Sequence, residues 1–252
     1  MSNYFKVAVN FPKINSVLTY KSELPLQKGQ LVEVPLGRRT SHGGIIEKVD
    51  KILEDLKKQA PDYIYQRTLS PEKAVNKPEK CSLTFFKGNL VAVNSKKNSP
   101  KNLLKKLNEL GGKHAIGRID LVENRFLGIK SRGIYETPGG TILLFAHRTI
   151  ESLTLNKNEQ HTKDELMPKY AELIYNGFWF SKERKKLQKI IDNTQRNVEG
   201  TVKLKLYKGN IIILERFSKK SLYSKDLVSF EGNKVFNPKN TERLIKKKRY
   251  RF

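Results

Sequence analysis

Short apolar runs alternate with turn-forming residues through residues 1–50. The runs at 7–9, 31–37 and 43–49 are rich in Val, Leu and Ile, and Pro, Gly or Asn lies within or beside each of them. This pattern is typical of short strands joined by turns. It predicts a small β module over residues 1–50, which buries little core by itself.

A polar connector follows this module. Its apolar positions at 52, 53 and 56 fit one or two helical turns, and then Pro61, Pro71 and Pro78 interrupt the chain. We expect a domain boundary here, with residues 51–64 as the junction.

Two hairpins are predicted further along the chain, each around the tripeptide Lys-Gly-Asn. One lies at residues 87–89 and the other at 208–210, and β-rich runs flank both. Before the second turn Val202, Leu204 and Leu206 alternate with lysines, which indicates one buried and one wet face.

Four segments have helical spacing. The first begins at Ser99-Pro100, a capping residue followed by a first-turn proline, and stops at Gly111-Gly112. The others are residues 142–153, a segment that starts at Pro168 and ends near 175, and one that follows Ser181 and closes near Gly200. Strands and helices together predict an α+β fold.

Composition excludes several classes of protein. The longest apolar runs fall far short of the roughly 18–20 residues of a membrane span, and the N-terminus lacks the apolar stretch of a signal peptide. Cys81 is the single cysteine, so neither a disulfide framework nor a cysteine zinc cluster is available. We expect a cytoplasmic protein with no metal site and no membrane partner.

The formal net charge of +25 has two readings. Clustered Lys and Arg suit a phosphate backbone, which favours nucleic-acid binding. The plainer reading is a lysine-rich solvated surface that attracts polyanions without specificity. The basic tail at 243–252 is most simply a solvated end.

The densest polar stretch is residues 117–140, GRIDLVENRFLGIKSRGIYETPGG. Arg118 and Asp120 alternate with apolar residues as on a half-buried strand, and the polar group continues through Arg125, Arg132 and Thr137. Opposite charges beside amide, hydroxyl and phenol groups suit a zwitterionic small molecule. The alternative is an internal salt-bridge network that fastens a strand.

In this stretch IGRIDLVENRF and KSRGIYETPGGTIL resemble the signature of the argininosuccinate synthase family. The likeness extends over residues 65–250 and includes AHRTIESLTL, PKYAELIYNGFWFSKERKKLQ and VKLKLYKGN. It implies the synthetase α+β domain of a ligase of arginine biosynthesis, which joins citrulline and aspartate at the expense of ATP, with magnesium, and releases AMP and pyrophosphate.

The resemblance assigns roles to particular residues. Glu123 and Tyr135 match residues that contact citrulline in the family, and Thr137 could approach the nucleotide. Arg132 matches a family arginine, either as a site residue or as a structural ion-pair partner. His114 and His147 are expected to be structural. A homotetramer is implied, with Leu244 and Ile245 among the contacts.

The family also has an ATP-pyrophosphatase-type, Rossmann-like domain, whose glycine-rich loop cradles the phosphates. We find no counterpart in this sequence, since Thr40–Gly44 has two glycines but lacks the rest of the pattern. The fragment is therefore expected to be inactive alone.

Residues 4–50 instead resemble the N-terminal 3′-DNA-binding domain of the primosomal replication helicase, through VAV, LVEVPLGRR and GGIIEKV. Gly37 matches a glycine of the pocket for the terminal nucleotide, and Lys28, Arg38 and Arg39 could contact phosphates. Thr19 stands where the family has an acidic residue. Three hypotheses remain for the whole chain: a ligase fragment covering residues 65–252, a DNA 3′-end-binding protein, and a fusion remnant without selected function.

Overall fold

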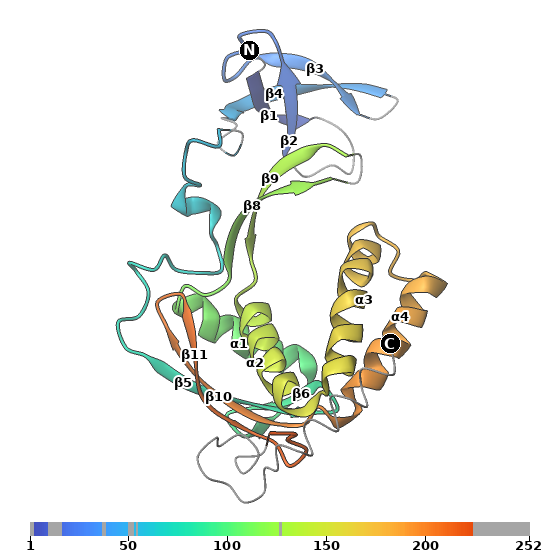
Figure 1. Ribbon diagram of the computed structural model, residues 1–252. Coiled ribbons are helices and arrows are strands. Elements are labelled where there is room, and N and C mark those ends of the chain that lie inside the picture. Colours follow the sequence, from blue (N-terminus) through green and yellow to red (C-terminus); the bar gives the residue numbers. More distant parts are fainter. Residues whose placement is uncertain are drawn as a thin grey trace, which may run out of the picture. The chain divides into compact units, whose positions relative to one another are not determined.

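The computed structural model describes residues 3–9, 17–36, 39–49, 53, 55–125 and 128–223 (Figure 1). The chain divides into two compact units. The first unit contains residues 1–64 and 120–134, and the second contains residues 65–119 and 135–252. None of the helices described is both long and apolar enough to cross a bilayer.

The sheet of the first unit has four antiparallel strands, ordered β2-β1-β4-β3. These are β1 (Asn3–Val9), β2 (Val17–Ser22), β3 (Leu31–Leu36) and β4 (Arg39–Val49). Phe5, Val7 and Val9 point to one face of β1 and join Val34 and Ile45 in a small core. The predicted β module is therefore present, with β2 as a strand that the pattern of apolar runs did not indicate.

The connector after this sheet is mostly irregular in its described part. It contains one short 3₁₀ turn, Asp62–Ile64. Of the helical turn predicted near its start, positions 52 and 54 lie outside the described residues, while Leu53 lies in a turn and Leu56 in another turn.

The second unit is built on a five-stranded sheet, ordered β11-β10-β5-β6-β7. Its strands are β5 (Glu79–Phe86), β6 (Asn89–Val93), β7 (Lys96–Lys97), β10 (Gly200–Tyr207) and β11 (Asn210–Phe217). Both predicted Lys-Gly-Asn hairpins are confirmed, because Gly88 and Gly209 take positive φ at the turns between β5 and β6 and between β10 and β11.

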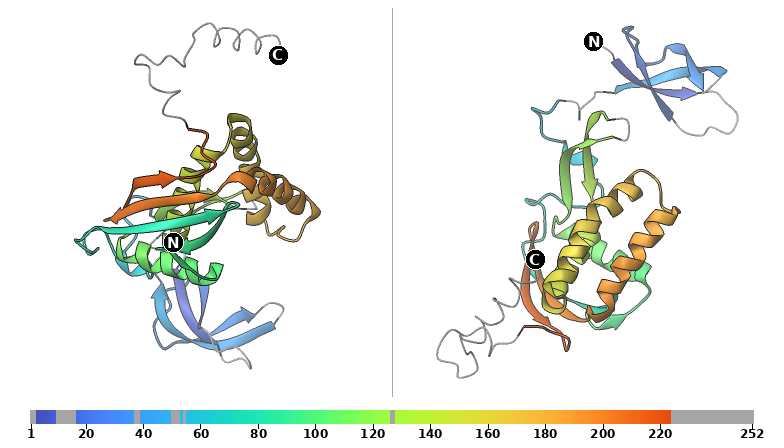
Figure 2. Two further views of the ribbon diagram at one scale, coloured as in Figure 1. Left: turned by 90° about the horizontal axis from the view of Figure 1, so that it is seen from below. Right: turned by 45° about the vertical axis from the view of Figure 1, so that its right-hand side comes forward.

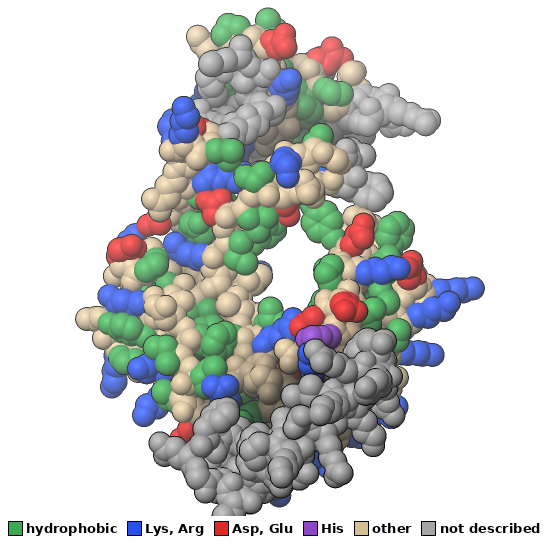
Figure 3. All heavy atoms as spheres, viewed as in Figure 1, with side chains coloured by type: hydrophobic (Ala, Val, Ile, Leu, Met, Phe, Trp, Pro, Cys, Tyr) green, Lys and Arg blue, Asp and Glu red, His purple; other side chains and the backbone are tan. Residues whose placement is uncertain are grey.

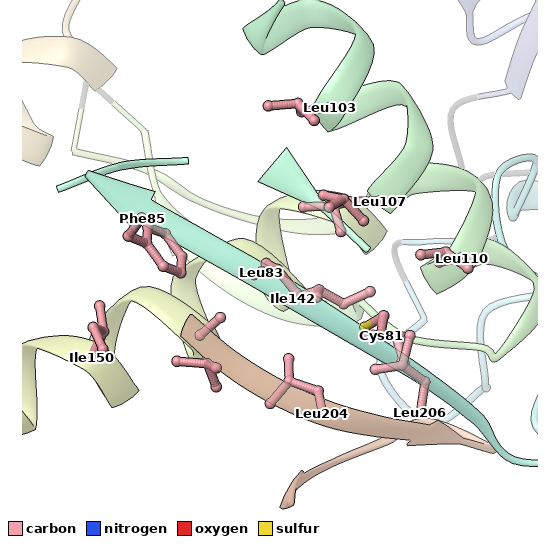
Figure 4. Packing of buried hydrophobic residues seen from close by; sticks show 14 of the residues in the cluster. Cys81, Leu83, Phe85, Leu103, Leu107, Leu110, Ile142, Ile150, Leu204 and Leu206 are labelled. Atoms are coloured by element: carbon pink, nitrogen blue, oxygen red, sulfur yellow. The ribbon is translucent and has the colours of Figure 1, made fainter. Parts of the chain in front are cut away.

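Two helices cover one face of this sheet, α1 (Pro100–Lys113) and α2 (Pro138–Thr154). Leucines of α1 belong to one buried cluster with Leu83 and Phe85 of β5 and Leu204 of β10, which Figure 4 shows. Ile142, Ala146 and Ile150 of α2 join the same cluster. As predicted, Ser99 caps α1, since its hydroxyl accepts a hydrogen bond from the Asn102 amide.

The last two helices are α3 (Lys157–Tyr175) and α4 (Lys182–Thr194), and the 3₁₀ turn Gln195–Asn197 follows α4. Figures 1 and 2 show α3 and α4 side by side. The expected helix start at Pro168 is wrong, because α3 begins eleven residues earlier, after the capping box of Asn156 and Glu159. Pro168 lies inside the helix.

Candidate functional site

The dense polar stretch forms the hairpin of β8 (Arg118–Asn124) and β9 (Lys130–Glu136). The Arg125 amide donates to the Ile129 carbonyl at 2.7 Å, and Gly128 takes a φ of +79° that suits glycine in this turn. The prediction of a half-buried strand is wrong for β8, because Ile119, Leu121 and Val122 are all exposed. The apolar positions of this strand therefore pack little within the chain.

At the base of the hairpin, two charged side chains hold the segment Tyr65–Thr68. The Arg118 guanidinium donates to the Thr68 hydroxyl and carbonyl, both at 2.8 Å, and lies 3.8 Å from the centre of the Tyr65 ring. From β9, the Glu136 carboxylate accepts hydrogen bonds from the amides of residues 66, 67 and 68 and, at 2.6 Å, from the Thr68 hydroxyl. We call Arg118, Glu136 and this segment the clamp.

The clamp favours the ionised form of Glu136. Burial by itself would raise the pKa of Glu136, but the hydrogen bonds from the Thr68 hydroxyl and from the three amides outweigh burial and lower the pKa. Arg118 was predicted to shape a site, and its described partners are those of a fastening residue. Glu136 was missed, although it lies in the same polar string, because its partners are almost 70 residues away in sequence.

Further along the hairpin, Asp120 and Arg132 form a bidentate ion pair across the strands, with N–O distances of 2.6 and 2.8 Å. The Arg132 side chain is only 8% exposed, and it also donates to the carbonyls of Asp55 at 3.2 Å and Lys58 at 2.9 Å. The hydrogen bond from Arg132 lowers the pKa of Asp120. This geometry supports the structural reading of Arg132.

The charged groups near the hairpin tip also lie in pairs. Glu123 and Arg125 are 3.3 Å apart, and the Arg125 guanidinium donates to the Ser131 hydroxyl at 2.6 Å. The Lys130 ammonium donates to the side-chain oxygen of Asn124 at 2.8 Å. The Glu123 side chain is 15% exposed, so a carboxylate is held close to a cation in a partly dehydrated place.

Tyr135 and Thr137 follow at the other end of β9. The Tyr135 side chain is exposed, whereas Thr137 is the residue before α2 and its hydroxyl lies 3.2 Å from that of Thr141. Glu123 belongs to the first unit and Tyr135 to the second. That they share one ligand stays a prediction, and so does the approach of Thr137 to a nucleotide.

Two histidines of the second unit, His114 and His147, lie in clusters of polar side chains. His114 is fully buried, with its Nε2 atom 3.3 Å from Glu79. His147 lies beside Glu151, which accepts hydrogen bonds from Lys163 and Gln195, both at 2.8 Å, so that α2 is joined to α3 and to the turn after α4. Burial lowers the pKa of His147, and burial raises the pKa of the Cys81 thiol to about 11.

The other predicted residues belong to the expected DNA-binding and subunit contacts. Lys28 is exposed in the turn before β3. Arg39 begins β4, and its side chain lies outside the description, as do Gly37, Arg38, Leu244 and Ile245. Within the described ranges, His, Cys, Asp and Glu form no group that could hold a metal ion.

Comparison with known proteins gives two family matches. The family described as arginosuccinate synthase C-terminal domain matches residues 45–251, and the 3′DNA-binding domain family matches residues 6–78. The two ranges overlap across the connector, so the junction at 51–64 stays a prediction.

Curated relatives include proteins named argininosuccinate synthase. The chain is 61% identical over 195 residues to that of Pelagibacter ubique, covering 77% of this chain and 49% of the relative. For Dinoroseobacter shibae the identity is 55% over 218 residues, covering 84% and 52%. For Zymomonas mobilis it is 56% over 197 residues, covering 78% and 48%. The chain thus spans about half the length of these relatives.

Proposed function

This chain belongs to the family of arginosuccinate synthase C-terminal domains, and on that premise we propose that its β8–β9 hairpin supplies citrulline-binding groups to an argininosuccinate synthase-type ligase. The observation that carries the proposal is the match over residues 45–251, which includes the whole hairpin. In that reaction the ureido oxygen of citrulline is adenylated by ATP with loss of pyrophosphate, and the amine of aspartate then displaces AMP.

The hairpin offers two side chains with the chemistry that citrulline needs. Glu123 provides a negative charge for an N–H group of the substrate, and the exposed Tyr135 provides a directional hydroxyl. Asp120 and Arg132 already bond to each other, and Arg132 also bonds to backbone carbonyls. They keep the hairpin in shape, and their groups are not free for substrate.

ATP needs a separate set of donors. Strand pairs of known register are antiparallel throughout the described part of the chain, which contains no strand, glycine-rich loop and helix of the phosphate-cradling kind. We therefore assign this chain the citrulline-binding part, and we propose that ATP and aspartate are bound by groups other than the described residues of this chain.

Titration calorimetry tests the assignment. L-citrulline is titrated into the chain, alone and mixed with the nucleotide-binding half of a relative, and into the Glu123→Ala variant. Loss of a charged hydrogen-bond partner should weaken citrulline binding by about tenfold or more. Glu109→Ala, which removes an exposed carboxylate from α1, is the matched control and should leave the affinity unchanged. Equal citrulline affinity in wild type and Glu123→Ala would refute the site.

A second candidate function rests on the first unit. The match of residues 6–78 to the 3′DNA-binding domain and the net charge of +25 favour binding to the 3′ end of a DNA strand. The test compares single strands that end in a 3′-hydroxyl with strands blocked by a 3′-phosphate. Preference for the free hydroxyl, together with weaker binding of both strands by a Lys28→Ala variant, supports this function. Equal binding of both strands contradicts it.

A further inference from the structure

Four lysines follow one side of α4. They occupy positions 182, 185, 186 and 189, a spacing that places them on adjacent turns of one helical face, and all four are exposed. Given the rise of an α-helix, they extend over about 10 Å. We call Lys182, Lys185, Lys186 and Lys189 the lysine stripe. Lys and Arg side chains project along the edge where α4 lies (Figure 3).

The acidic residues of α4 do not neutralise the lysine stripe. Glu183 pairs with Lys169 of α3 at 2.9 Å, and Asp192 accepts a hydrogen bond from Gln188 at 2.8 Å. None of the four stripe lysines has an ion pair or side-chain hydrogen bond to another described residue. Like charges at this spacing repel one another, so the stripe is an unneutralised row of cations.

Exposed aromatic rings lead into the same helix. Phe178, Trp179 and Phe180 precede the capping residue Ser181, with exposed fractions of 48%, 50% and 82%. The Arg184 guanidinium lies 4.8 Å from the centre of the Trp179 ring and donates to the Trp179 carbonyl, which steadies this end of α4. Rings beside a row of cations are the combination that binds bases and phosphates of a single strand.

An anionic membrane is the other surface that attracts lysines and aromatic residues. A helix that lies on a membrane must turn an apolar face toward the lipid. The buried side chain of α4 is Leu187, and the Gln188 that follows it is bonded to Tyr170 of α3, so this face of α4 is directed into the protein. The exposed face carries the lysine stripe, with Ile190 as its one large exposed apolar residue, which favours a polynucleotide.

We propose that the lysine stripe and the aromatic residues 178–180 form a binding surface for single-stranded polynucleotide. Phosphates lie along the lysines, and one or two bases stack on the rings. The surface is in the second unit and does not depend on either function proposed above.

The test uses the full chain and a circular, internally labelled oligo-dT, which has no 3′ end for the first unit to bind. Fluorescence anisotropy gives the affinity at several salt concentrations. The triple variant Lys185→Ala, Lys186→Ala, Lys189→Ala should bind about tenfold more weakly and lower the salt slope by about 2. Replacing the same three lysines by Arg should preserve binding.

Matched controls separate this surface from general charge. The variant Lys97→Ala, Lys101→Ala, Lys105→Ala removes three exposed lysines from β7 and α1, and its affinity should stay within twofold of wild type. Phe180→Ala should weaken binding about fivefold. Phe217→Ala, which removes an exposed ring at the end of β11, should leave the affinity unchanged.

Three results would overturn the proposal. Equal loss of affinity in the two triple-alanine variants would mean that only net charge matters. Binding to vesicles of anionic phospholipid without binding to the circle would assign the stripe to a membrane. Binding to neither probe would remove the surface altogether, while a 3′-end preference of the first unit would be unaffected.

Discussion

Polar side chains of the β8–β9 hairpin mostly satisfy one another. The ion pairs Asp120–Arg132 and Glu123–Arg125 and the bond between Lys130 and Asn124 use groups within the hairpin. The density of charge was visible in the sequence, which left ligand binding and a salt-bridge network as alternatives. The geometry supports the network for Arg132 and Arg118, and substrate contact stays a prediction for Glu123 and Tyr135.

Arg132 is expected to stabilise the fold. In Arg132→Ala, the Asp120 carboxylate and the carbonyls of Asp55 and Lys58 lose a nearly buried donor, which should lower the free energy of unfolding by about 2 kcal/mol. Urea denaturation measures the change, with exposed Arg216→Ala as the control. A loss no larger than that of the control would show that the network contributes nothing.

His147 should make stability depend on pH. Its pKa is lowered from 6.5 in the fold, because burial opposes the charged form, so the unfolded chain binds the proton more readily. The contribution of neutral His147 to the free energy of unfolding is therefore present above about pH 6.5, and the free energy of unfolding decreases as the pH falls below that value. In His147→Gln the decrease in melting temperature between pH 7 and pH 5.5 should become smaller. His161→Gln, at an exposed position of α3, should retain the full decrease.

Elements set by local signals were predictable from the sequence. Ser99 and Ser181 cap α1 and α4, and positive φ at Gly88 and Gly209 closes the two hairpins, because each of these depends on residues within one turn. The exposure of the apolar residues of β8 was not predictable, because alternation suggests a buried face but cannot say whether another element covers that face. The clamp joins residues about 50 and 70 positions apart, which no local pattern reveals.

Pro168 shows tertiary structure prevailing over a local signal. Helix α3 continues through it, although proline cannot donate to the carbonyl four residues earlier. Pro168→Ala should therefore raise the free energy of unfolding by about 2 kcal/mol, the difference between the helix penalty and the lost rigidity of the unfolded chain. Thermal unfolding followed by circular dichroism measures it. A lower melting temperature would mean that the proline ring is needed for packing.

The molecule as a whole has two separate hydrophobic cores among its described residues. One gathers around Val7 in the first unit, and the other around Leu204 in the second. Two cores that have no residue in common can unfold independently of each other. Calorimetry should therefore show two transitions, with Leu204→Ala lowering only one midpoint and Val7→Ala only the other. A single transition that both variants shift equally would contradict independent cores.

The clamp also limits where another coding sequence can be fused upstream of this domain. Its backbone donors begin at Gln66, and its stacking ring is Tyr65, so the segment that Glu136 and Arg118 bind within the clamp starts at that position. A gene rearrangement with its breakpoint before codon 65 would replace the Asp55 and Lys58 carbonyls that Arg132 contacts, but it would leave the clamp intact. A breakpoint a few codons later would remove the partners of Glu136 at residues 66–68. An upstream fusion partner can therefore be joined before residue 65 but not within the next few residues.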